Sequence, residues 1–389
     1  MVKKKLSNPV SLIAGTAMGA GFLGLPYVIA KTGFLIGFIY LILIGLFVLF
    51  VQLCLGEIVL RTKGNNQLTG YAKKYLGNKG KKLMLFIMMF YIFSTLIAYL
   101  IGGGESLSYI LFGNNNYALL FSILFWILLS TLTYIGLRAL KLYGKIGFYF
   151  ILAFIFLIVL FYSPSIQTEN LTFIEPENFF FPFGIVLFSF MSFSSIPAAQ
   201  RLLLGKERWM KKSIILGILI PFIVYFLFTL VLLGNFGKQV PEIATLALGR
   251  FFAFVGAFAI FTSYLSLNIS LRDMFRFDFK VKRNHAWFIC SIVPIIAFLI
   301  IYFFKLVSFV QILSIAGVIA GGSTGILILI MNLKSKQKGR RIPEYSIPLN
   351  KIAIILLSLI FIFGIIIQLG GEKIISLLKL NFSLILSLV

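Results

Sequence analysis

The stretch Gly15–Pro26 is the part of the sequence where bare backbone could do chemistry. It holds four glycines and a proline inside an apolar run that extends from residue 9 to residue 30. That run is long enough to cross a bilayer at about 1.5 Å of rise per residue. Glycines weaken a helix and proline removes a backbone donor, so a segment that only spans a membrane would not carry them. The sequence therefore predicts an unwound membrane helix whose freed N–H and C=O groups face a ligand, because such groups are tolerated at membrane depth only beside protein, water or ligand.

A second interruption lies within the apolar span 179–203. Four serines in Phe188–Pro197 compete for backbone hydrogen bonds, and Pro197 stops the ladder. Close helix packing through Gly15 and Gly19, which have the small-xxx-small spacing, is the alternative explanation of the first interruption. That alternative needs two unrelated accidents to explain both interruptions.

The elements that must position these breaks are membrane helices. With 60% hydrophobic and 12% charged residues, the chain has far fewer charges than the ~25% of a soluble domain, and it predicts one all-α polytopic membrane domain over residues 1–389. The apolar tail 374–389 predicts either an interfacial helix or a marginal twelfth span. Apolar stretches of about 20 residues predict eleven transmembrane helices, at 9–30, 33–60, 83–111, 117–137, 145–163, 179–203, 211–234, 250–273, 287–304, 308–332 and 351–370.

The two interrupted spans occupy corresponding places in two groups of five. Residues 9–163 form the first group and residues 179–332 the second, with 351–370 as an extra helix. Five is odd, so the second group begins on the opposite membrane face, which predicts a 5+5 inverted repeat. Paired interrupted segments in two such halves are the sequence sign of a transporter's binding site.

Basic residues indicate the orientation. Of the 35 lysines and arginines, 29 fall on one side of the predicted helices. The positive-inside rule then places the N-terminus and segments 62–82 and 333–350 on the cytoplasmic side of the cell membrane. It places segment 164–178 and the C-terminus on the external side. The net charge of +24 is thus explained by membrane topology and by attraction of the basic residues to anionic lipid. No nucleic-acid partner is needed to explain it.

Three segments resemble those of known transporters. Gly15–Pro26 is similar to the first-helix signature of the amino acid/auxin permease family and of the bacterial aromatic amino acid permeases. Phe190–Pro197 is similar to that family's sixth-helix break, and Thr262–Asp273 resembles the aromatic permeases' eighth-helix stretch. The resemblance implies the leucine-transporter fold of the amino acid–polyamine–organocation superfamily. One departure is Ser194, which follows Phe193 where the family often has an acidic residue, so no role of that acid is carried over.

The broken helices suggest how an amino acid would be held. Free N–H groups at a half-helix N-terminus suit a carboxylate, and here they would come from Gly19, Ala20, Gly21 and Phe22. Carbonyls around Met191, Ser192 and Ser194 would accept from the ammonium group. The expected side-chain pocket predicts a neutral, bulky, apolar amino acid, and the resemblance favours an aromatic one; its residues are Phe22, Tyr99, Phe190, Phe193, Ser192 and Ser194.

The coupling ion has two candidates and no other cofactor is expected. Carbonyls of Gly15 and Met18 with the hydroxyls of Thr262 and Ser263 would make an oxygen-only sodium site, at the positions that match the fold's sodium site. The alternative is that both hydroxyls bond back to their own helix. Some relatives place a lysine from the fifth helix there, and its absence from 146–162 favours sodium over a proton. A proton carried by Glu105 is the other option, because ionisable groups inside membranes are functional by default.

Other classes of protein fit less well. A membrane-embedded enzyme needs paired acids, a histidine cluster or an activated nucleophile, whereas the eleven acids are scattered and His285 is the single histidine. A channel would need a filter motif, and none is apparent. Transport of another small amine or organic solute stays open. So do the amino acid carried, the direction of transport and the oligomeric state, for which a monomer is one option.

Overall fold

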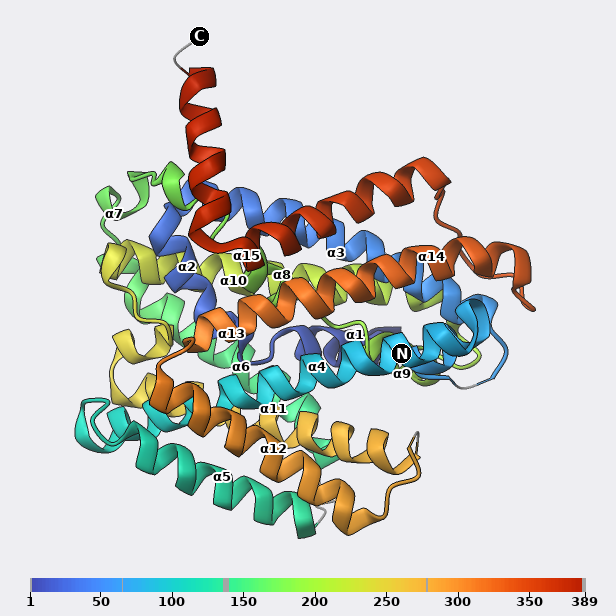
Figure 1. Ribbon diagram of the computed structural model, residues 1–389, viewed down its shortest axis with the longest axis horizontal. Coiled ribbons are helices and arrows are strands. Elements are labelled where there is room, and N and C mark those ends of the chain that lie inside the picture. The colour runs from blue at the N-terminus through green and yellow to red at the C-terminus, as the bar shows by residue number, and fades with distance from the viewer. Residues whose placement is uncertain (1, 65, 136–139, 278, 387–389) are drawn as a thin grey trace.

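The computed structural model describes residues 2–64, 66–135, 140–277 and 279–386, and in this part of the chain the regular elements are all helices, without a strand (Figure 1). Most of the long helices run along one direction. The α-helices are α1 (Val2–Ala17), α2 (Leu25–Thr32), α3 (Phe34–Arg61), α4 (Leu68–Phe112), α5 (Ala118–Ile135), α6 (Leu140–Tyr162), α7 (Glu169–Thr172), α8 (Phe183–Phe190), α9 (Ser195–Leu202), α10 (Met210–Phe236), α11 (Arg250–Phe277), α12 (Arg283–Phe304), α13 (Phe309–Ala316), α14 (Gly322–Lys338) and α15 (Lys351–Leu386).

The number of membrane spans agrees with the sequence. Among the described residues, ten helices are long and apolar enough to cross a membrane, and the bent pair Leu6–Ala17 and Ala20–Thr32 makes an eleventh if it is one span. Residues 136–137 of the expected span 117–137 lie outside the described residues. The tail continues α15 as helix to Leu386, and residues 387–389 also lie outside the described part.

One segment differs from the expectation. Most of segment 62–82 and the expected span 83–111 share the 45-residue helix α4, which is kinked at Gly77, where φ is 80°. The apolar side chains of the short arm before the kink, among them Tyr71 and Tyr75, are buried in the protein rather than laid on the membrane surface. The Tyr75 hydroxyl lies 2.7 Å from the hydroxyl of Thr62, just after α3. The arm therefore closes over the end of α3.

The first interrupted span breaks directly after α1. Gly19 is extended, with φ −63° and ψ −172°, and a 3-10 helix, η1 (Ala20–Gly24), leads into α2. Pro26 lies in the first turn of α2, where its missing N–H costs no hydrogen bond. The glycines thus allow the break, and the proline starts the helix that follows it.

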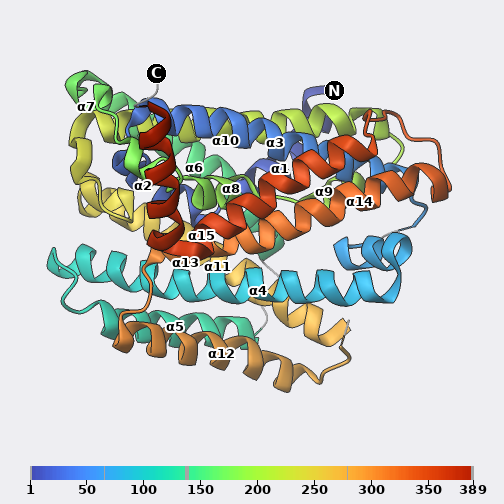
Figure 2. The ribbon, with the colours of Figure 1, turned by 45° about the horizontal axis from the view of Figure 1, so that its top comes forward.

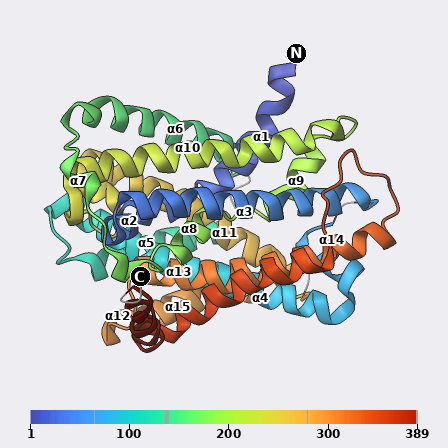
Figure 3. The ribbon, with the colours of Figure 1, turned by 90° about the horizontal axis from the view of Figure 1, so that it is seen from above.

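The second interrupted span repeats this design. After α8 the chain is extended at Met191, with ψ 108°, and it becomes helical again in α9, whose first turn contains Pro197. This span lies at the centre of the bundle. In its most apolar stretch of 18 residues, 78% of the residues are buried, against 28% in the corresponding stretch of α12. Figures 2 and 3 show α8 within the bundle, between α3 and α10 on one side and α4 and α13 on the other. The break in α8–α9 is therefore enclosed by other helices.

Helix α8 packs closely on the segment that joins α13 to α14. That segment is a π-helix, η7 (Gly317–Gly321). A Cβ atom on Gly317 would lie 2.8 Å from Cβ of Phe188 in α8, and one on Gly321 would lie 2.7 Å from the Met191 sulfur. Single-turn π-helices occur often at functional sites. Here the π-helix lies directly beside the second break.

Candidate functional site

Polar groups from two helices surround the extended residue of the first break. The Ala20 N–H donates to the Tyr99 hydroxyl oxygen at 3.3 Å. A Cβ on Gly19 would lie 3.4 Å from that oxygen and 3.8 Å from Ser263 Oγ. The structure thus brings together Gly19, Ala20, Tyr99 and Ser263, which the sequence assigned to the substrate and ion sites.

The remaining residues of the first break lie against other helices. A Cβ on Gly21 would lie only 2.7 Å from Cδ1 of Phe188, so the backbone of η1 touches α8. Phe22 is buried, and its ring packs edge-on against Phe228 of α10 at 5.3 Å between centroids. Both contacts hold the broken segment against α8 and α10.

At the second break, a glutamine of α3 satisfies the end of α8. Gln52 is fully buried, and its Nε2 donates to Phe190 O at 3.2 Å and to Ser192 Oγ at 2.8 Å. Ser192 O accepts from both the N–H and the hydroxyl of Ser195, at 3.0 and 2.6 Å. Since a carbonyl has two lone pairs, Ser192 O is already occupied. An ammonium group would therefore rely on the Met191 and Ser194 carbonyls.

The side chains of the second break divide into buried and exposed ones. Phe190 packs against the Tyr225 ring, and Met191 and Phe193 are buried. Ser194 is exposed, unlike these three. The expected pocket residues of this segment thus do not all face one way.

A tyrosine of α10 joins the two breaks. The Tyr225 hydroxyl lies 2.8 Å from Ala17 O, at the end of α1, and 2.8 Å from Ser189 O, near the end of α8. Sequence reasoning missed both Tyr225 and Gln52. Gln52 carried a signal, since it is a lone polar residue between apolar neighbours in α3, whereas Tyr225 lies among many aromatic residues and carried none.

The two expected ion-binding hydroxyls are oriented differently. Thr262 Oγ1 donates to Phe258 O and Ala259 O of its own helix, both at 3.1 Å, whereas Ser263 faces Gly19. Met18 is fully buried, and its N–H still donates to Ala14 O as in a helix. Gly15 lies within α1 and is partly exposed. Of this set, Ser263 is the side chain placed at the break.

Glu105 lies on α4, six residues beyond Tyr99, which is about 9 Å along the helix. Its carboxyl group is partly buried, and the nearby charge that acts on it is Glu242. Glu242 in turn accepts the Val310 N–H at 3.1 Å, at the start of α13. Glu105 therefore lies about 9 Å along α4 from Tyr99, which contacts the first break, and the charge that acts on it comes from the segment before α11.

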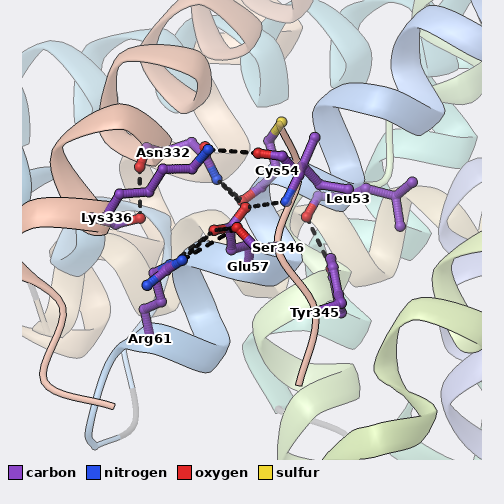
Figure 4. A network of polar contacts seen from close by, with 10 residues as sticks. Leu53, Cys54, Glu57, Arg61, Asn332, Lys336, Tyr345 and Ser346 are labelled. Atoms are coloured by element: carbon purple, nitrogen blue, oxygen red, sulfur yellow. Dashed lines mark hydrogen bonds and ion pairs between the residues drawn. The ribbon is translucent and has the colours of Figure 1, made fainter. Parts of the chain in front are cut away.

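A second polar cluster lies at the far end of α3 (Figure 4). Glu57 is fully buried, and its carboxylate accepts from Arg61 and Ser346, both at 2.8 Å, from the Ile347 N–H at 2.9 Å and from Asn332 at 3.1 Å. These donors come from α3, from α14 and from the segment 339–350 after α14. Glu57 is therefore the centre of a network that packs the end of α3 against α14 and segment 339–350.

The same cluster is closed by a tyrosine from segment 339–350. The Tyr345 hydroxyl donates to Leu53 O of α3 at 2.9 Å. Burial raises the pKa of Tyr345, so this hydroxyl stays protonated and able to donate. We call Glu57, Arg61, Asn332, Tyr345 and Ser346 the α3–α14 clamp.

Comparison with known proteins places these features in a family. The chain is 26% identical over 322 residues to tyrosine-specific transport system 1 of Haemophilus influenzae, covering 75% of this chain and 79% of that protein. It is 24% identical over 401 residues to tyrosine-specific transport system 2 of the same organism, covering 95% and 96%. Glutamine transporter 2 of Aliivibrio fischeri is 24% identical over 237 residues, covering 59% and 61%.

A family profile covers almost the whole chain. The profile of the tryptophan/tyrosine permease family matches residues 2–246 and 238–369, which include both breaks and all the expected site residues. The chain therefore belongs to the tryptophan/tyrosine permease family.

Proposed function

We propose that this protein is a secondary active transporter that carries neutral, apolar or aromatic amino acids across the cell membrane by cation symport with alternating access. Membership in a permease family makes it a transporter rather than an enzyme. The observation that carries the proposal is the meeting of two broken membrane helices, whose end groups are bound by Tyr99, Tyr225 and Gln52. Backbone of this kind at membrane depth is typical of transporter binding sites.

The substrate class follows from what the breaks offer. The relatives named above are tyrosine and glutamine transporters, and both of these amino acids are uncharged. N–H groups of Gly19–Phe22 would hold the carboxylate, and carbonyls near the end of α8 would hold the ammonium group. Phe22, Tyr99, Phe190 and Phe193 would enclose an apolar or aromatic side chain. No charged side chain lies in either break, which favours a neutral substrate.

The proposed architecture is a single domain over 1–389 with inverted repeats 9–163 and 179–332 and an additional helix at 351–370. Two features support it: the repeats begin with spans that break in the same manner, and each restarts with a proline in the first turn. In such repeats, one group of helices moves against the other around a site near the middle of the membrane. The binding groups at the two breaks would then open to one side at a time.

Sodium is the proposed coupling ion, at a site made by Gly15, Met18, Thr262 and Ser263. The placement of Ser263 beside Gly19 supports this, whereas the internal bonds of Thr262 support it less. A proton carried by Glu105 is the competing proposal. The partial burial of Glu105 beside Glu242 is the feature that favours it.

Uptake into liposomes tests the function. Purified protein in liposomes should accumulate radiolabelled tyrosine against its gradient when sodium is added outside, and uptake should saturate. Unlabelled phenylalanine and leucine should compete, whereas lysine and glutamate should not. Stronger competition by lysine or glutamate would refute the neutral substrate, and uptake that does not saturate would indicate a channel.

A further inference from the structure

Tyr225 lies where the ends of the two broken helices converge. It is fully buried, and its hydroxyl oxygen is 2.8 Å from both Ala17 O and Ser189 O. Ala17 is the last residue of α1, and Ser189 is in the last turn of α8. The last four carbonyls of a helix have no partner within that helix. One side chain therefore satisfies the end of each broken helix.

The arrangement has more acceptors than protons. A tyrosine hydroxyl carries a single proton, so Ala17 O and Ser189 O must share it. Both carbonyls belong to helix C-termini, which carry partial negative charge and repel each other. The shared proton is the attractive link between them.

Packing holds the Tyr225 ring at this position. It meets the Phe190 ring edge-on, at 5.2 Å between centroids and 64° between planes. On the same face of α10, a Cβ on Gly217 would lie 2.6 Å from Ile13 of α1, and Phe228 packs on Phe22. Helix α10 therefore contacts α1 before the first break and η1 after it, while Tyr225 also reaches the second break.

We propose that Tyr225 is a positioning residue for transport, one that ties the end of α1 to the end of α8 through a shared proton. The role in transport rests on the function proposed above. When either helix end moves away, the proton stays bonded to the other, so separation of the ends does not leave the hydroxyl without an acceptor. Tyr225 thus sets the spacing of the two breaks when they bind substrate together and permits them to part.

The variant Tyr225→Phe removes the hydroxyl and leaves the ring. Its matched control is Tyr345→Phe, which also removes a tyrosine hydroxyl bonded to a backbone carbonyl, but at the α3–α14 clamp. Because the binding groups lie on both breaks, Tyr225→Phe should raise the tyrosine concentration for half-maximal uptake about tenfold. Tyr345→Phe should change it less than twofold, although both variants lose a similar amount of thermal stability. Equal shifts in the two variants, or no shift in Tyr225→Phe, would overturn the role in transport.

Backbone hydrogen exchange tests the tie without any substrate. In the unliganded protein, Tyr225→Phe should speed amide exchange about tenfold in peptides covering both breaks, 14–24 and 186–196, and Tyr345→Phe should leave both unchanged. Faster exchange at one break alone, or at neither, would refute the shared tie. This result stands even if the wild-type protein carries no amino acid into liposomes, which would refute only the proposed function.

Discussion

At Gly21 the backbone of the first break lies against the Phe188 ring of α8. Any Cβ at this position would be 2.7 Å from Cδ1 of that ring and 3.1 Å from Ser189 Oγ. Both neighbours are buried in a central helix, so they cannot easily move. The absence of a side chain at residue 21 therefore sets how closely the two broken helices approach.

Gly21→Val should reduce uptake at least tenfold while the protein stays folded. The added side chain would push η1 away from α8, and overpacking of this kind costs about 1–3 kcal/mol. Gly147→Val is the control, because a Cβ at Gly147 of α6 meets no atom within 4 Å. Uptake in liposomes and elution as a single species in detergent are the measurements. Unchanged uptake by Gly21→Val would contradict a site at this break.

Ser263→Ala should remove most of the sodium stimulation of uptake, and Thr262→Ala should remove little. Ser263 Oγ faces the first break, whereas the Thr262 hydroxyl bonds to carbonyls of its own helix. The measurement is tyrosine uptake with and without an inward sodium gradient at constant pH, with the double variant Thr262→Ala/Ser263→Ala alongside. Wild-type uptake that follows an imposed pH gradient and ignores sodium would reject the sodium site and direct attention to Glu105.

At the scale of helices, local features could be predicted from sequence and tertiary ones could not. The break after α1 follows from glycines and a proline that are close together in the chain, as does the break between α8 and α9 from its serines and Pro197. Tyr225 and Gln52 act on backbone far away in sequence, and Tyr225 lies 208 residues from Ala17. No local pattern marks such a partner, because its role depends on how α10 and α3 pack.

The short arm of α4 shows the same limit. Its sequence pattern has one apolar face, and such a face fits either a membrane or a protein surface. In the structure the arm packs on the protein itself, at the end of α3. The kink at Gly77 brings the arm to this position. The choice between the two surfaces is made by tertiary contacts.

Glu57→Gln should loosen the α3–α14 clamp. The carboxylate accepts four hydrogen bonds, and an amide in its place turns a donor group toward two of those donors. Loss of a buried acceptor costs about 1–3 kcal/mol, so trypsin should cleave segment 339–350 after Arg340 or Arg341 about tenfold faster. Glu169→Gln, at an exposed residue of α7, is the control. An unchanged cleavage rate would show that the clamp does not hold this segment.

At the scale of the whole molecule, the structure separates the segments that the charge pattern assigned to opposite sides. Figure 1 shows α7 at one end of the helix bundle and the ends of α3 and α14 at the other. The basic segments 62–82 and 333–350 thus share one end, as their charge predicted. Which end faces the cytoplasm follows from the positive-inside rule, and it stays a prediction.

Cysteine labelling from outside intact cells tests that orientation. Lys79→Cys and Gln337→Cys should resist a membrane-impermeant maleimide, and Thr168→Cys should react; all three positions are exposed in the structure. The native thiols, Cys54 and Cys290, are both buried, so background labelling should be low. Labelling of permeabilised cells confirms that each introduced thiol is reactive. Strong labelling of Lys79→Cys in intact cells, with none of Thr168→Cys, would reverse the orientation and with it the side from which substrate enters.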